Sequence, residues 1–132
     1  MATTPTDIAY DRAGPTDAPV VVLIHAGVAD RRMWDPQWAA LSRTHHVVRL
    51  DLRGFGDSAT PPEGALANVE DVVATLDHLD VRSCHLVGAS MGAGVAVEVA
   101  LTVPGLVRSL TLCPPGGSLF AEITDDLGSF WR

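Results

Sequence analysis

A run of apolar residues from Val20 to Ile24, most of them β-branched, is the feature that most constrains the fold. A strand that is apolar at every position, and not only at alternate ones, is typical of a parallel sheet with both faces buried. Shorter runs follow at Val47–Leu50, Cys84–Val87 and Leu110–Leu112, and Ile8–Tyr10 predicts a further strand at an edge. The sequence therefore predicts a mostly parallel sheet.

Helical segments alternate with these strands. Met33–Ser42 predicts a short helix, and Met91–Val103 predicts a longer helix that ends before Pro104. A third helix is predicted after Asn68, a suitable N-cap, because apolar residues recur there at helical spacing: Val69, Val72, Val73, Leu76 and Leu79. Parallel neighbours need crossover connections, so the alternation predicts an α/β fold of three layers, with helices on both faces of the sheet.

Composition excludes several classes of function. The chain has 132 residues, 47% of them hydrophobic, which suits one globular domain with a core. Its net charge of -7 and its dispersed basic residues disfavour nucleic acid as a partner. The N-terminus has no signal-peptide pattern, and no apolar stretch approaches the roughly 20 residues that span a bilayer. We therefore expect a cytoplasmic protein with no membrane partner.

The two cysteines, Cys84 and Cys113, are expected at the start of one strand and at the end of another. If these strands are parallel neighbours, the two Cα atoms lie beyond the ~7 Å limit for a disulfide bond. Both thiols are therefore predicted to be reduced.

The segment Gly88-Ala89-Ser90-Met91-Gly92 fits the pattern G-x-S-x-G and separates a predicted strand from a predicted helix. A serine hydroxyl is a weak nucleophile, so it must project from a fixed point toward a base. A tight strand-to-helix turn provides that point, and small residues at both ends of the pattern let the strand and the helix approach each other. The free N–H groups at the start of the helix can stabilise an oxyanion. We interpret Ser90 as a nucleophile.

Two other segments stand at strand ends in a similar way. His25-Ala26-Gly27 follows the strand that ends at Ile24, and Asp51-Leu52-Arg53-Gly54-Phe55-Gly56-Asp57-Ser58 follows the strand that ends at Leu50. Together with the serine motif, and in this order, they resemble the α/β-hydrolase superfamily over roughly residues 8–115. The region from His25 to Pro36 is most similar to enol-lactonases and related small esterases.

The resemblance implies a role for each matching residue. It makes Ser90 the catalytic nucleophile and the N–H groups of Met91 and Gly27 the oxyanion hole, with Val28 as the alternative to Gly27. Ala26 is a departure, because many relatives have glycine at that position. Structural support is implied for His25, Gly88, Gly92, Asp51, Arg53 and Ser58. An Asp–Arg contact and turn hydrogen bonds would satisfy the polar groups of the loop after Leu50.

The reaction that the resemblance implies is acyl transfer from a small ester or lactone to water. Ser90 would attack the carbonyl carbon while backbone N–H groups hold the oxyanion, and neither a metal nor an organic cofactor would be needed. Serine at this position disfavours dehalogenase and epoxide-hydrolase chemistry. The residues of this chain do not specify which ester or lactone is cleaved.

In this superfamily the catalytic acid and the histidine base follow the serine along the chain. All five histidines precede Ser90, and His85 lies at the far end of the same predicted strand, about 16 Å away. The carboxylates after Ser90 do not follow a strand end. We therefore expect residues 1–118 to form a truncated hydrolase core without acid or base, and residues 119–132 to begin a cap segment.

Two consequences are expected for the chain by itself. Turnover should be low because no base activates Ser90. The strand Leu110–Leu112 should expose an open edge, and such edges pair with other chains. Self-association through that edge is therefore predicted.

Two alternative functions stay open. Gly88, Gly92 and Gly94 also resemble the glycine pattern of short-chain dehydrogenases, which would suit an NAD(P)-dependent reductase. Against it, that pattern should open the fold, and the single tyrosine is Tyr10. The other alternative is a non-catalytic hydrolase fragment that only binds or associates.

Overall fold

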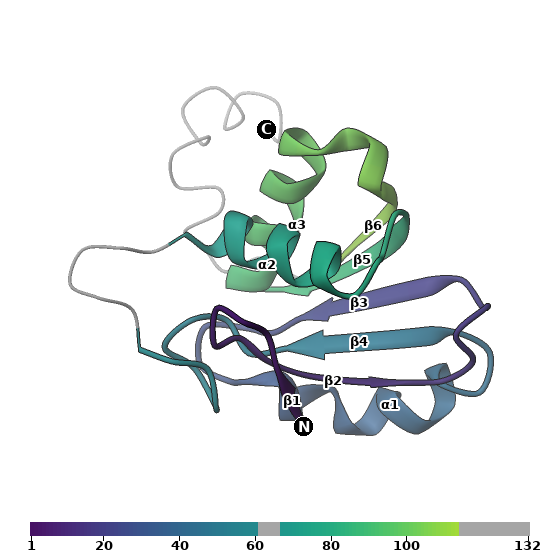
Figure 1. The fold of residues 1–132 in the computed structure, drawn as a ribbon, viewed down its shortest axis with the longest axis horizontal. Coiled ribbons are helices and arrows are strands. Elements are labelled where there is room, and N and C mark those ends of the chain that lie inside the picture. Colours follow the sequence, from purple (N-terminus) through teal and green to yellow (C-terminus); the bar gives the residue numbers. More distant parts are fainter. Residues whose placement is uncertain (61–66, 114–132) are drawn as a thin grey trace, which may run out of the picture.

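Four consecutive parallel strands, from β4 to the edge strand β6, belong to a six-stranded sheet, whose order is β1-β2-β4-β3-β5-β6. The computed structural model describes residues 1–60 and 67–113 (Figure 1). Its strands are β1 (Ala2–Thr3), β2 (Ala9–Ala13), β3 (Val20–Ile24), β4 (His46–Leu50), β5 (Cys84–Ala89) and β6 (Val107–Cys113). Only β1 and β2 run antiparallel to their neighbours. The predicted α/β fold with a mostly parallel sheet is confirmed.

Helices cover both faces of the sheet (Figure 1). They are η1 (Arg31–Trp34), α1 (Asp35–Leu41), α2 (Asn68–His78), α3 (Met91–Thr102) and η2 (Pro104–Leu106). Successive residues of β3 point to opposite faces, so Val22 and Ile24 join the core under α2 and α3, whereas Val21 and Leu23 join the cluster under α1. This division explains why the strand is apolar at every position.

The N-terminal elements differ from the expectation in two ways. The strand predicted at Ile8–Tyr10 is β2, and it is not the edge of the sheet because the two residues of β1 pair outside it. The helix predicted at Met33–Ser42 is divided into η1 and α1, with Pro36 in the first turn of α1. Proline lacks a backbone N–H and is favoured at a helix start, so the chain begins a new helix there.

The two cysteines lie on the neighbouring parallel strands β5 and β6, at opposite ends. Cys84 pairs in register with Val107, whereas Cys113 pairs with Ala89. Both are free thiols, as predicted. Burial raises the pKa of the Cys84 thiol to about 11, because a thiolate would lose its hydration.

Two further sequence predictions concern the domain boundary near the C-terminus and the absence of a membrane-spanning helix. The division at residue 118 and the cap segment at residues 119–132 lie outside the described residues. In the described ranges, none of the helices has the length and the apolar character that crossing a bilayer requires.

Candidate active site

Ser90 lies at a sharp turn between the end of β5 and the start of α3. Its backbone has φ 52° and ψ −114°, a conformation that non-glycine residues rarely adopt. Such strain costs about 1–3 kcal/mol and persists only where surrounding packing enforces it. The turn projects the half-buried Ser90 side chain beyond the carboxyl end of the strand.

Two glycines permit this turn by removing side chains from close backbone contacts. A Cβ at Gly88 would overlap the carbonyl group of Gly92 and would lie 2.7 Å from Cα of Ala93. A Cβ at Gly92 would overlap the carbonyl groups of Ile24 and His25. The first turn of α3 therefore rests directly on the ends of β5 and β3.

The two residues implied as oxyanion donors lie in contact. Ile24 and Gly88 pair in register, so the loop after β3 begins beside the end of β5. A Cβ at Gly27 would lie 3.3 Å from Sδ and 3.4 Å from Cβ of Met91. As the first residue of α3, Met91 has an N–H with no acceptor inside the helix.

The second donor stays open between two adjacent residues. Within the described ranges, neither the Gly27 N–H nor the Val28 N–H takes part in a hydrogen bond. The Val28 side chain is fully exposed. Within these ranges, the hydrogen bonds do not distinguish the Gly27 N–H from the Val28 N–H as the second donor.

His25 is completely buried, and both of its ring nitrogens have partners. The Leu52 N–H donates to Nε2 at 2.9 Å, so Nε2 carries no proton. The proton is then on Nδ1, which donates to the Ala26 carbonyl oxygen at 2.7 Å. The ring also lies against Phe55, with 5.1 Å between centroids. These contacts leave His25 no free nitrogen for a reacting proton.

The two backbone polar groups of Ala26, the residue before Gly27, are held by His25, Ala29 and Met33. The Ala26 carbonyl oxygen accepts from His25 Nδ1 and from the Ala29 N–H at 3.1 Å. The Ala26 N–H donates to Sδ of Met33 at 3.3 Å. Because a trans peptide is planar, fixing the carbonyl also fixes the opposite direction of the Gly27 N–H. The loop is therefore well defined although Ala26 replaces glycine.

Asp51 is the buried centre of the loop after β4. Its fully buried carboxylate accepts the N–H of Arg31 at 2.7 Å and the N–H of Asp57 at 2.9 Å, and it pairs with the Arg31 guanidinium. The Ser58 hydroxyl donates to the Asp51 carbonyl at 2.6 Å and accepts the Ala9 N–H. Asp51 thus joins three segments of the chain.

Arg53 does not pair with Asp51 but contacts a different carboxylate. Its guanidinium pairs with Asp71 of α2 at 2.9 Å and donates to the Thr6 carbonyl oxygen at 2.8 Å. The arginine that contacts Asp51 is Arg31, which sequence reasoning missed. Nothing in the local pattern around Arg31 distinguishes it from the exposed Arg32 next to it.

Arg31 is buried among three carboxylates from two segments: Asp11 of β2, and Asp51 and Asp57 of the loop after β4. Burial by itself would lower the pKa of Arg31, but hydrogen bonds with these carboxylates outweigh it and raise the pKa. Burial would likewise raise the pKa of Asp11, but the guanidinium groups of Arg31 and Arg49 hold it below its ordinary value. Both shifts favour the charged forms of Arg31 and Asp11.

The described residues do not bring an acid or a base to Ser90. His85 stands at the other end of β5, where its Nδ1 lies 2.6 Å from the hydroxyl of Ser109 on β6. No hydrogen bond joins the Ser90 side chain to a carboxylate or imidazole within residues 1–60 and 67–113. In the same ranges, no group of histidine, cysteine and carboxylate side chains could hold a metal ion.

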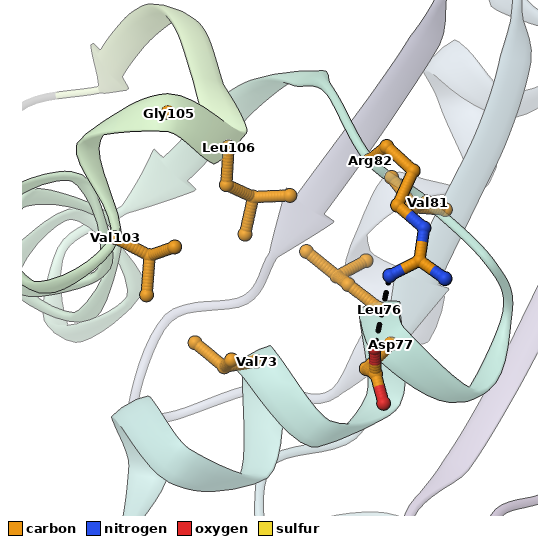
Figure 2. Close-up of a pocket in the computed structure, with 8 residues that line it drawn as sticks. All are labelled: Val73, Leu76, Asp77, Val81, Arg82, Val103, Gly105 and Leu106. Atoms are coloured by element: carbon orange, nitrogen blue, oxygen red, sulfur yellow. Dashed lines mark hydrogen bonds and ion pairs between the residues drawn. The ribbon is translucent and has the colours of Figure 1, made fainter.

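A surface cavity of about 250 Å³ lies far from Ser90, between the end of α2 and η2 (Figure 2). Arg82 and Asp77 form an ion pair of 3.3 Å at its margin, and both side chains are largely exposed. The apolar wall consists of Val73, Leu76, Val81, Val103 and Leu106. This cavity is at the amino ends of β5 and β6, opposite the elbow, so it is not the site where Ser90 would act.

Comparison with known proteins agrees with this geometry. A family model described as alpha/beta hydrolase fold matches residues 19–131. The 3-oxoadipate enol-lactonase 1 of Acinetobacter baylyi is 34% identical over 110 residues, which are 83% of this chain and 41% of that protein. An acetyltransferase component of the acetoin cleaving system of Pseudomonas putida is 38% identical over 82% of this chain and 30% of its own length.

A solved structure shows the same likeness in three dimensions. The enol-lactonase from Burkholderia xenovorans LB400 superposes with a TM-score of 0.73 and 31% identity, over 78% of this chain and 41% of that chain. The chain therefore spans less than half the length of each of these three proteins.

Proposed function

Because the chain belongs to the α/β-hydrolase fold family, we propose that it supplies the nucleophile and the oxyanion hole of a serine hydrolase acting on a small ester or lactone. The observation that carries this proposal is the positive φ of Ser90 at a turn between strand and helix. The similarity to enol-lactonases supports a lactone or ester as substrate class.

In the proposed reaction, Ser90 Oγ attacks the carbonyl carbon of the substrate and gives up its proton to a base. The electron pair of the carbonyl bond moves to oxygen, where the N–H groups of Met91 and Gly27 stabilise the charge. The intermediate collapses by expelling the alcohol oxygen, which takes up a proton. Water then attacks the acyl-serine ester in the same way and releases the carboxylate and Ser90.

The base and the acid of this reaction are not among the described residues near Ser90. His25 cannot act as the base, since Nε2 accepts the Leu52 N–H and Nδ1 donates to Ala26. An activated serine needs an adjacent base, and the protein must therefore obtain one from elsewhere. The described chain contributes position and electrostatic stabilisation.

Labelling with a fluorophosphonate tests the nucleophile. Ser90 Oγ displaces fluoride from phosphorus, and the oxyanion donors direct this electrophile to Ser90 even when the base is absent. We expect slow formation of a single adduct on Ser90, located by peptide mass spectrometry. Ser90→Ala should abolish the adduct. Ser109→Ala is the matched control, because Ser109 has a histidine partner, as Ser90 does not within the described residues, but lies at the opposite end of the sheet; an adduct on Ser109 would contradict the proposal.

Turnover by the 132-residue chain alone is expected to be low. Without a base the Ser90 hydroxyl stays protonated, and an oxyanion hole by itself provides only residual catalysis. Hydrolysis of p-nitrophenyl acetate should therefore stay within about twofold of Ser90→Ala. A much faster rate for the native chain would mean that another group, for example from a second chain, supplies the base.

A second candidate role, association, is favoured by strand β6. In the described ranges β6 pairs with β5 alone, and Leu110 and Leu112 are 38% and 42% exposed on it. These two leucines lie in register with Leu86 and Gly88, which face α3. An edge that has no second partner among the described residues, beside exposed leucines, favours pairing with a second copy of the chain.

Light scattering over a concentration series measures this association. We expect the mean mass to rise with concentration, and Leu112→Lys to weaken association about tenfold, equivalent to ~1.4 kcal/mol. Val28→Lys places the same charge on a fully exposed valine away from β6 and should leave association unchanged. A strictly monomeric native chain would contradict the edge argument.

A further inference from the structure

The loop that carries Gly27 is anchored at both ends to adjacent residues that follow β4. At its start, the buried His25 accepts the Leu52 N–H at 2.9 Å. At its end, Arg31 is buried and bonds to the carboxylate of Asp51 through both its backbone N–H and its guanidinium. The residues between these anchors include the candidate oxyanion donor.

Arg31 differs from the arginine that follows it. The Arg31 side chain is 9% exposed and reaches carboxylates on β2 and in the loop after β4. The Arg32 side chain is 74% exposed, and within residues 1–60 and 67–113 it pairs with Asp30 alone. Two adjacent arginines in one turn therefore have very different surroundings, and of the two side chains Arg31 is the one that bonds to β2 and to the loop after β4.

Arg31 is connected to Gly27 indirectly, through η1. Arg31 is the first residue of η1, which also contains Met33. Sδ of Met33 accepts the N–H of Ala26, the residue immediately before Gly27. Displacement of Arg31 from Asp51 would move η1, release the Ala26 N–H and loosen the peptide that presents the Gly27 N–H.

We infer that Arg31 is a positioning residue for the oxyanion hole, acting through its ion pair with the buried Asp51. This inference rests on the proposed function, in which the Gly27 N–H stabilises the oxyanion. Arg31 does not touch the substrate. A neutral residue in its place would leave the Asp51 carboxylate buried without its principal counter-charge, and the loop would no longer be held in one conformation.

Amide NMR on the ¹⁵N-labelled chain tests the inference without requiring activity. Arg31→Met should shift the Gly27 and Val28 amide signals and speed their hydrogen exchange by about tenfold, while amides of β3 and β5 stay protected. Arg32→Met removes the same charge from the same turn and should change neither the Gly27 and Val28 amide signals nor their hydrogen exchange. Arg31→Lys keeps one positive charge and should give an intermediate shift. Equal effects of Arg31→Met and Arg32→Met on Gly27 would overturn the inference.

A second variant keeps the test decisive if Arg31→Met does not fold. Arg31→Met combined with Asp51→Asn removes the uncompensated charge, yet it also lacks the ion pair, so the Gly27 signal should still be displaced. A native Gly27 signal in this double variant would overturn the inference.

Labelling of Ser90 separates this inference from the proposed function. Arg31→Met should slow fluorophosphonate labelling about tenfold, and Arg32→Met should leave the rate unchanged. A native chain that forms no Ser90 adduct would contradict the proposed function, and the Gly27 amide signals would still decide the role of Arg31. Labelling at the native rate in a folded Arg31→Met chain would overturn the inference.

Discussion

Replacing Gly92 with alanine is expected to destabilise the chain by ~3 kcal/mol or more. The added Cβ would overlap the carbonyl groups of Ile24 and His25. These are backbone atoms at the end of the central strand β3, so they cannot move aside without breaking the packing of α3 on the sheet. Since small domains are stable by about 5–15 kcal/mol, a large part of the folding free energy would be lost. Urea denaturation followed by circular dichroism measures the change.

Gly105→Ala is the matched control for this substitution. A Cβ at Gly105 meets no atom of the described residues within 4 Å, and the residue is exposed in η2. Its effect should stay within about 0.5 kcal/mol. If the midpoint of urea unfolding were the same for Gly92→Ala as for Gly105→Ala, the close approach of α3 to β3 would not exist in solution.

The central sheet could be predicted because its strands are apolar at every position. Val20–Ile24 was predicted with the bounds that β3 has, and Val47–Leu50 lacks only the first residue of β4. Each of these strands contributes to a core on both faces, so a continuous apolar run is the direct consequence of its position. The order of the strands is not encoded in such runs.

The N-terminal hairpin and the divided helix could not be predicted to the same degree. β1 has only two residues, and it exists through its pairing with Thr3 opposite Ala9 and Ala2 opposite Tyr10. The two residues of β1 have no strand pattern of their own, because the strand is defined only by its pairing with β2. Pro36 is visible in the sequence, but helical spacing continues across it, so the break between η1 and α1 became clear from the structure.

The turn at Ser90 was predictable because its glycines lie at fixed positions around it. The support of the loop that carries Gly27 was not, because Arg31 acts through a partner that is distant in sequence and Met33 acts through an uncommon acceptor, its sulfur. Arg31 is 20 residues from Asp51 and Met33 contacts the N–H of Ala26 through sulfur. The Arg31–Asp51 contact depends on how β3 and β4 lie side by side, and no local sequence pattern predicts it.

The same dependence on distant partners makes His25 sensitive to substitution. Its ring fills a fully buried position against Phe55, and it is the acceptor for the Leu52 N–H at 2.9 Å. Removal of the ring would leave that N–H buried without a partner and would create a cavity at the end of β3. The Ala26 carbonyl would keep only the Ala29 N–H.

We expect His25→Ala to destabilise the chain by ~3–5 kcal/mol, from the sum of an unsatisfied buried donor and a cavity. This corresponds to a decrease in Tm of ~10–20 °C, measured by thermal denaturation. His85→Ala removes a histidine from the neighbouring strand, where the ring is only partly buried and bonds to Ser109, and it should cost less than ~1 kcal/mol. His25→Ala should also displace the Gly27 amide signal, because Nδ1 no longer holds the peptide before it. A Tm for His25→Ala equal to that of His85→Ala would show that the ring does not support the loop that carries Gly27.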